Sequence, residues 1–187
     1  YIPMVYYHVW DNYPYPVFNK PFYESNDVIF AISKVTYDIV TTVAPTVKCE
    51  YLPHAVNTDI FKPAEDETEI ENMRESLMQD YYDPDKFIIF WNNRNARRKM
   101  SGSLIHWFNE FAEQVGPENV RLIMHTDPKD KHGQDLAHII NHLEADDGRI
   151  MLSTKKIPPE ALAVMYNISD CTINISDAEG FGLATLE

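Results

Sequence analysis

Cysteine, glycine and basic residues are all scarce in this sequence of 187 residues, which contains two cysteines and six glycines. Cys49 and Cys171 lie far apart and form no C-x-x-C pair, so the sequence suggests neither a zinc site nor a redox site. Sixteen basic residues stand against twenty-nine acidic ones, giving a formal net charge of −13. Nucleic acids and anionic membranes need a basic surface, so this balance argues against both as partners.

Long apolar runs are also missing from the sequence. None approaches the roughly 20 residues that a membrane-spanning helix needs, and no charged segment followed by an apolar one marks a signal peptide at the start. We therefore predict a cytoplasmic protein with reduced cysteines. The chain begins within a predicted strand and ends within a predicted helix, so we expect a fragment of a longer protein.

What the sequence does contain is enough apolar material for a core and a regular alternation of elements after Lys86. Hydrophobic residues make up 44% of the chain. Strands are expected at residues 87–91, 120–124, 149–152 and 171–176, the last as a buried strand, and helices at 103–115, around 136–143 and after Pro158–Pro159. Four strand–helix units in series predict a parallel, doubly wound sheet with ligands at the carboxyl ends of its strands.

The first part of the chain shows the same alternation on a smaller scale. Strands are expected at residues 2–10, 28–32 and 47–52, with a loop at 11–21 and a helix from the N-cap Ser33 to about Val43. These elements predict the closing part of a second α/β domain. After an acidic linker, Ile70, Met73, Leu77 and Tyr81 recur at helical spacing and predict one more helix.

The last stretch, Asp170–Glu187 (DCTINISDAEGFGLATLE), combines a strand, a glycine turn and the start of a helix. This order leaves backbone N–H groups at the sheet edge, and glycines let an anion approach them closely. Glu179 and Glu187 flank these donors and would repel a phosphate, so hydroxyl groups suit them better. The alternative is an ordinary turn with two solvated carboxylates.

The loop after the strand at 87–91 is basic, with the sequence NNRNARRK at residues 92–99. Four of the six residues from Arg94 to Lys99 are cations, which is unusual in so acidic a chain. Cleaving a sugar from a nucleotide leaves a diphosphate whose charge grows in the transition state. Fixed cations and N–H donors stabilise that charge, and one such contact is worth roughly 3–4 kcal/mol. The alternative is a solvated basic loop or a crystal-style patch of salt bridges.

The E-x-F-G-x-x-x-x-E spacing at 179–187 and the R-x-x-x-x-K spacing of Arg94 and Lys99 resemble the motifs of GT-B glycosyltransferases, in particular the retaining family 4 (group 1). The resemblance covers about residues 2–187. It implies an α/β chain of GT-B type: residues 1–62 would be the closing part of an acceptor-side Rossmann-like domain with the hinge. Residues 63–187 would be a doubly wound, Rossmann-like nucleotide-sugar-binding domain, truncated at its C-terminus.

The resemblance also implies roles for individual residues. Arg94 and Lys99 would contact the donor phosphates, as would the backbone of Gly180, Phe181, Gly182 and Leu183. Glu179 would hold hydroxyls of the donor sugar, Glu187 would hold those of the ribose, and His8 would face the sugar across the interdomain cleft. The donor would be a UDP-, GDP- or ADP-sugar and the acceptor a glycan, a lipid or a protein, with no bound metal and no tightly bound cofactor.

Three positions depart from the family pattern. Asn93 and Met100 stand where glycine is common around the basic loop, and His54-Ala55 replaces an Asn-Gly in the hinge segment. Ala55 would tolerate a positive φ poorly.

Other functions remain open at this point. A non-catalytic nucleotide-binding module is one, and a glycoside hydrolase using Glu179 and Glu187 is another, although a hydrolase has no use for the cationic loop. His138 and His142 lie four residues apart, a spacing that can bind zinc, but an exposed helix face explains them more simply. The sequence does not indicate the oligomeric state.

Overall fold

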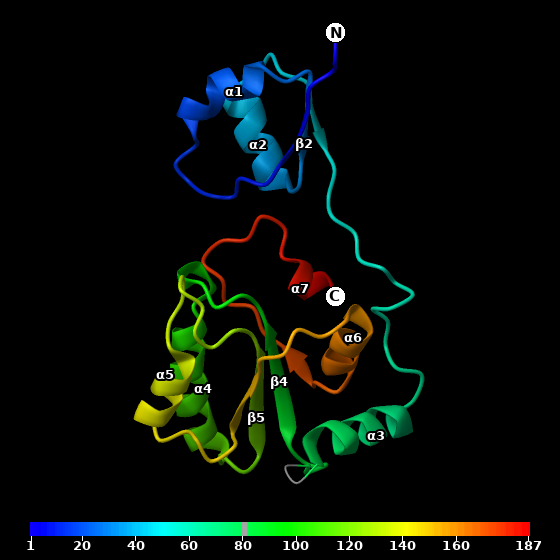
Figure 1. Cartoon of the computed structure of the whole chain (residues 1–187), viewed down its shortest axis with the longest axis vertical. Helices are drawn as coiled ribbons and strands as arrows, with labels where there is room; N and C mark the ends of the chain where they lie inside the picture. Colours follow the sequence, from blue (N-terminus) through cyan, green and yellow to red (C-terminus); the bar gives the residue numbers. More distant parts are fainter. Residues whose placement is uncertain (80–81) are drawn as a thin grey trace. The chain divides into compact units, whose positions relative to one another are not determined.

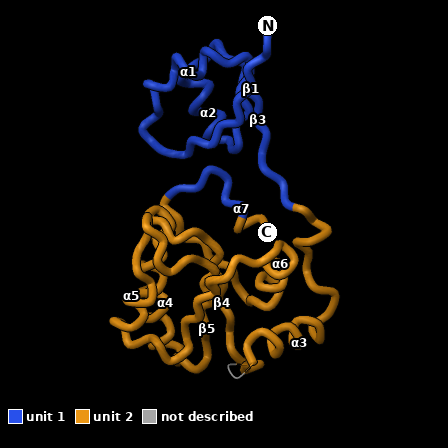
Figure 2. Tube along the Cα trace, in the orientation of Figure 1, with its two compact units in different colours: residues 1–56, 178–183 blue, residues 57–177, 184–187 orange. Residues whose placement is uncertain are grey.

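The computed structural model describes residues 1–79 and 82–187, so Tyr81 of the predicted helix lies outside the described residues. The described chain forms two compact units (Figure 2). Unit 1 comprises Tyr1–Val56 with Ala178–Leu183, and unit 2 comprises Asn57–Asp177 with Ala184–Glu187. Each unit contains a parallel sheet with helices packed on it. The predicted boundary between residues 62 and 63 separates the two domains of a GT-B fold, and it stays a prediction.

Unit 1 is built on a three-stranded parallel sheet. The strands are β1 (Val5–His8), β2 (Val28–Ala31) and β3 (Cys49–Tyr51), in the order β1-β2-β3. The segment 11–21 was predicted as a loop, but it contains η1 (Val17–Asn19) and the start of α1 (Lys20–Glu24). Pro21 is compatible with this helix because it lies in the first turn, where its missing N–H has no partner to lose.

The helix predicted from Ser33 is confirmed as α2 (Lys34–Val43). Ser33 is its N-cap, and its Oγ accepts a hydrogen bond from the Thr36 backbone N–H at 3.1 Å. The core of unit 1 joins α1, α2 and β2 through buried side chains: Tyr23, Ile29, Ile39, Val40, Val43 and Ala44.

Unit 2 contains the regular alternation that the sequence predicts. Its four parallel strands are β4 (Phe87–Asn92), β5 (Val120–His125), β6 (Ile150–Ser153) and β7 (Cys171–Thr172), in the order β6-β5-β4-β7. The helices are α3 (Glu67–Met78), α4 (Ser101–Val115), α5 (Leu136–His142) and α6 (Pro159–Asn167), with η3 (Arg97–Lys99) before α4. The one-turn α7 (Leu183–Leu186) also lies in unit 2, except for its first residue.

The helices of unit 2 cover both faces of its sheet, with α4 and α5 on one side and α3 and α6 on the other (Figure 1). Side chains of β4 alternate between these two layers because successive residues of a strand point to opposite faces. Ile88 and Phe90 pack with Met165 of α6, whereas Trp91 packs with Leu104 of α4. The sheet is therefore doubly wound, as predicted.

The strand predicted at 171–176 is much shorter than expected. Only Cys171 and Thr172 pair with β4, and both are exposed, so the expectation of a buried strand is wrong. Within the described residues β7 pairs on one side alone, which leaves its other side uncovered. Its start is nevertheless fixed, because Asp170 accepts a hydrogen bond from the Ile88 N–H at 2.7 Å and pairs with the buried Arg74 at 2.9 Å.

No helix in the described part of the chain is long and apolar enough to cross a membrane. The φ of Ala55 is not positive, because Gln79, Met100 and Glu144 are the described non-glycine residues with positive φ. The alanine in the hinge segment is therefore not strained in this way.

Candidate functional site

The basic loop follows β4 at the carboxyl edge of the unit 2 sheet, and it is held rigidly. Asn95 is completely buried at its centre. The Asn95 amide nitrogen donates to the Gln134 carbonyl at 2.7 Å, while its Oδ1 accepts from Ser101 Oγ at 2.7 Å and from Gln134 N at 3.2 Å. A Cβ on Gly133 would lie 2.1 Å from the Asn95 carbonyl oxygen, so these two loops are in close contact. Asn95 and Lys99 are buried, whereas Arg94, Arg97 and Arg98 are exposed, so the loop is anchored at its centre while three of its cations face solvent.

Arg94 forms a two-pronged ion pair with Asp130, on the loop that follows β5. Its Nε donates to Asp130 Oδ2 at 2.6 Å and its Nη2 to Oδ1 at 3.1 Å. These hydrogen bonds lower the pKa of Asp130 to about 2 and raise the pKa of Arg94. The pair fixes the direction of the guanidinium, whose side chain is still 60% exposed.

Lys99 lies at the end of η3 and is only 8% exposed, so the protein covers most of this residue. The next residue, Met100, adopts a left-handed conformation with φ of 57°. This backbone conformation explains why glycine suits the position, since a side chain there is strained. Asn93, the other departure from glycine, has a buried amide nitrogen with no hydrogen-bond partner among the described residues.

The closing stretch approaches the basic loop within unit 2. The backbone N–H of Asp177 donates to the Arg98 carbonyl at 2.8 Å, which ties the segment after β7 to the loop after β4. Further along, Thr185 of α7 accepts a hydrogen bond from Asn174 at 3.3 Å. Two of the segments that the sequence singled out are thus neighbours at one sheet edge.

Glu187 is held by a tyrosine that the sequence did not single out. Tyr166, on α6, has its hydroxyl 3.0 Å from Glu187 Oε2 and 3.1 Å from the Ala184 carbonyl. Asn92, the last residue of β4, donates to the same hydroxyl at 3.0 Å. Glu187 is therefore connected to the carboxyl end of the central strand.

The glycine turn itself, residues 178–183, belongs to unit 1. A Cβ on Gly180 would lie 3.1 Å from the carbonyl oxygen of Val9, the residue after β1. Phe181 packs edge-on against His54, with ring centroids 5.6 Å apart. Gly182 has a φ of 81°, which a residue with a side chain rarely adopts. The backbone at Gly182 therefore favours glycine, and a side chain at Gly180 would crowd the Val9 carbonyl.

His8 ends β1 and is almost fully buried, with 4% of its surface exposed. Its Nε2 is 2.7 Å from the Tyr23 hydroxyl, and burial lowers its pKa. The side chain is thus a neutral imidazole in contact with the core of unit 1, and a role toward the donor sugar stays a prediction.

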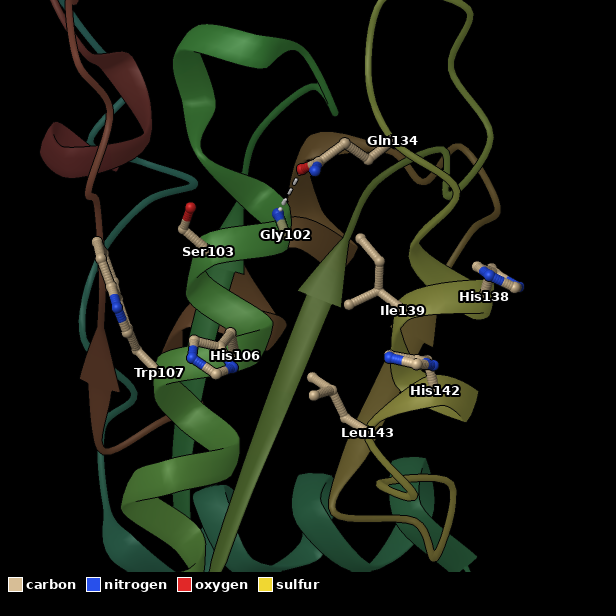
Figure 3. A pocket seen from close by; sticks show the side chains of 9 residues that line it. All are labelled: Gly102, Ser103, His106, Trp107, Gln134, His138, Ile139, His142 and Leu143. Atoms are coloured by element: carbon tan, nitrogen blue, oxygen red, sulfur yellow. Dashed lines mark hydrogen bonds between the residues drawn. The ribbon is translucent and has the colours of Figure 1, made fainter.

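A pocket of about 450 Å³ lies between α4 and α5, and Gln134, whose backbone binds Asn95, is among its lining residues (Figure 3). His106 projects from α4, and His138 and His142 project from α5, with Ile139 and Leu143 between the helices. In the part of the chain that the structure describes, no group of three or more His, Cys, Asp and Glu residues could hold a metal ion. The histidine pair of α5 is accordingly not part of a metal centre formed by the described residues.

Solved structures share this arrangement of elements. A glycosyltransferase from Rickettsia africae is 19% identical over 89% of this chain and 43% of its own, with a TM-score of 0.66. HepE from Anabaena, solved in complex with UDP, is 15% identical over 93% of this chain and 47% of its own, with a TM-score of 0.67. A UDP-forming α,α-trehalose-phosphate synthase from Burkholderia xenovorans is 14% identical over 97% and 49%, with a TM-score of 0.63.

The chain has a GT-B-type α/β fold. It spans less than half the length of each of these three proteins. No family model matches the sequence, and no curated protein matches it. At identities below 20% the likeness concerns the fold, so the chemistry must be argued from the residues of this chain.

Three residues of the site were missed by the sequence analysis: Asn95, Asp130 and Tyr166. Asp130 follows β5 at the same sheet edge as the basic loop, so its position could have been anticipated, but its pairing with Arg94 could not. Asn95 lies within the basic loop, and a polar residue between cations carries no sequence signal of burial. Tyr166 was predicted on an apolar helix face, and only its hydroxyl contacts reveal a second role.

Proposed function

We propose that this chain is part of a nucleotide-sugar-dependent glycosyltransferase of GT-B type, related to the retaining family 4. In this proposal residues 1–62 belong to the acceptor-side domain, and residues 63–187 form the nucleotide-sugar-binding domain. The donor is a UDP-, GDP- or ADP-sugar and the acceptor is a glycan, a lipid or a protein. No metal and no tightly bound cofactor take part.

Each proposed contact uses a group with suitable chemistry. Arg94 and Lys99 neutralise the departing diphosphate, with the amides of Gly182 and Leu183 as further donors. Two of the five N–H donors of Arg94 bind Asp130, so the guanidinium can contact a phosphate without breaking that pair. Glu179 accepts hydrogen bonds from the sugar, and Glu187 accepts them from the ribose.

The observation that carries the proposal is the rigid cationic loop at the carboxyl end of β4. A buried Asn95, a buried Lys99 and a paired Arg94 fix cations at the sheet edge where doubly wound folds bind ligands. Cations that are already in place need no reorganisation when the diphosphate charge develops, which is the property that electrostatic catalysis requires. A hydrolase has no such need, so this observation favours phosphate chemistry over glycoside hydrolysis.

Thermal unfolding with UDP, GDP and ADP tests the proposal. A nucleotide at a hundredfold excess over its Kd should stabilise the chain by about 2.7 kcal/mol. Arg94→Ala should weaken the binding of that nucleotide by roughly ten- to hundredfold, because a hydrogen bond to a charged group contributes about 1.5–3 kcal/mol. Lys131→Ala is the matched control, because it removes one exposed charge from the neighbouring loop and should leave the affinity nearly unchanged.

The outcomes separate the three functions. Release of nucleoside diphosphate from a nucleotide-sugar in the presence of acceptor supports the transferase. Nucleotide binding without turnover, in a protein that contains the remaining parts of the fold, supports a binding module instead. Cleavage of a glycoside without any nucleotide effect would replace the proposal with a hydrolase.

A further inference from the structure

The hydroxyl of Tyr166 is a junction between three segments of unit 2. It receives a hydrogen bond from Asn92 at the end of β4 at 3.0 Å. It lies 3.1 Å from the Ala184 carbonyl and 3.0 Å from Glu187 Oε2, both near the end of the chain. A single oxygen atom thus connects the central strand, α6 and α7.

The direction of these hydrogen bonds is set by the chemistry of the groups. A tyrosine hydroxyl has one hydrogen to donate and can also accept. The Asn92 amide can only donate through its nitrogen, so it occupies an acceptor site and leaves the hydroxyl hydrogen for α7. Of the two acceptors there, the Glu187 carboxylate is charged and forms the stronger bond. Burial and the nearby Glu187 charge raise the pKa of Tyr166, so the hydroxyl keeps its hydrogen.

The ring of Tyr166 is fixed as firmly as its hydroxyl. It packs edge-on against Phe90 of β4, with centroids 5.0 Å apart and planes at 84°. Phe61 packs against it in a second edge contact, at 6.2 Å and 74°. Because the ring cannot swing freely, its hydroxyl is a defined point from which the otherwise flexible Glu187 side chain is held.

We propose that Tyr166 is a positioning residue that orients the Glu187 carboxylate toward a ribose diol and thereby sets a preference for ribonucleotides. The inference rests on the proposed function, because it assigns the partner of Glu187. A carboxylate has about four acceptor sites on its two oxygens, so it can accept from both hydroxyls of a diol while Oε2 also accepts from Tyr166. Tyr166 holds Oε2 from the side of α6 and so restricts the rotation of the carboxylate.

The test compares the affinities of UDP, GDP and ADP with those of their 2′,3′-dideoxy counterparts, measured by titration calorimetry. The unmodified chain should prefer the ribonucleotide by at least roughly tenfold, the effect of a hydrogen bond to a charged group. Tyr166→Phe should lose most of this preference. Because the readout is a ratio of two affinities, a general loss of stability does not mimic the result.

Tyr82→Phe is the matched control. Tyr82 donates to Glu71 at 2.7 Å in the same unit, so this change also removes one tyrosine–glutamate hydrogen bond, and it should leave the ratio unchanged. Glu187→Gln should lower the ratio by itself, and adding Tyr166→Phe to it should have no further effect if Tyr166 acts through Glu187. Should Tyr166→Phe fail to fold, Asn92→Ala, which removes the donor to the same hydroxyl, should lower the ratio in the same direction.

The failures are distinguishable. If none of the three nucleotides binds the unmodified chain, the proposed function and this inference are both overturned. If a nucleotide binds and Tyr166→Phe retains the full ribose preference, the positioning role is overturned while the donor site stands. If the unmodified chain binds a ribonucleotide and its dideoxy counterpart equally well, Glu187 does not bind the ribose. The positioning role of Tyr166 is then overturned as well.

Discussion

Replacing Asn95 by alanine should lower the free energy of unfolding and weaken nucleotide binding at the same time. Asn95 is fully buried and makes three hydrogen bonds, to the Gln134 backbone twice and to Ser101. A buried hydrogen bond contributes about 1 kcal/mol net, and the groups left behind lose their partners. We therefore expect a loss of roughly 2–4 kcal/mol, a large part of the 5–15 kcal/mol by which a domain is usually stable.

Urea unfolding, followed by tryptophan fluorescence, measures this loss. Trp91 and Trp107 report on unit 2, whereas Trp10 lies in unit 1. Ser101→Ala removes one of the three hydrogen bonds and should cost about 1 kcal/mol. Asn72→Ala is the matched control, because Asn72 is exposed on α3 and its replacement should stay within about 0.5 kcal/mol.

The same variants separate rigidity from charge. Asn95→Ala removes no cation, so a fall in nucleotide affinity would come from the loosened loop that carries Arg94 and Lys99. The double variant of Asn95 and Ser101 should be no less stable than Asn95→Ala, since Ser101 has already lost its acceptor. An Asn95→Ala chain as stable as the Asn72→Ala control would refute the idea that this amide holds the loop.

Three further predictions concern the backbone and the charges of the site. Gly182→Ala forces a side chain onto a φ of 81° and should weaken nucleotide binding, measured by calorimetry, roughly fivefold or more. Gly148→Ala is its control, because it strains the backbone in the same way, at a φ of 91°, and should leave the nucleotide affinity unchanged. Met100→Gly relieves a left-handed residue and should raise stability in urea by up to about 1 kcal/mol, and a clear loss would contradict the strain argument. Folding lowers the pKa of Asp130 from 3.8 to about 2, so the contribution of this carboxylate to stability is complete above about pH 4 and disappears toward pH 2. Asp130→Asn should flatten the dependence of the unfolding free energy on pH in this range. An unchanged slope would count against the pair with Arg94.

The sequence by itself determined most of the secondary structure and the doubly wound layout of unit 2. Apolar periodicity located α4 and the strands β4, β5 and β6 to within a few residues, because these elements bury one face or both faces in a continuous core. The chemical type of the β4 loop could be predicted as well, since four cations in an acidic chain stand out without any knowledge of neighbours. The sequence failed at β7, where a short apolar run predicted a buried strand although only Cys171 and Thr172 pair and both are exposed.

Only the tertiary structure decided which groups meet. Asp130 lies 36 residues from Arg94, and Tyr166 lies 21 residues from Glu187, so no local pattern connects either pair. The type of a residue determines what its side chain can donate, accept or neutralise. Arg94 and Glu187 could therefore be identified as candidates from the sequence. Which partner holds the side chain in place depends on how strands and helices pack. That packing brings Asn95 to Gln134, Asp130 to Arg94 and Tyr166 to Glu187, each across segments far apart in the chain.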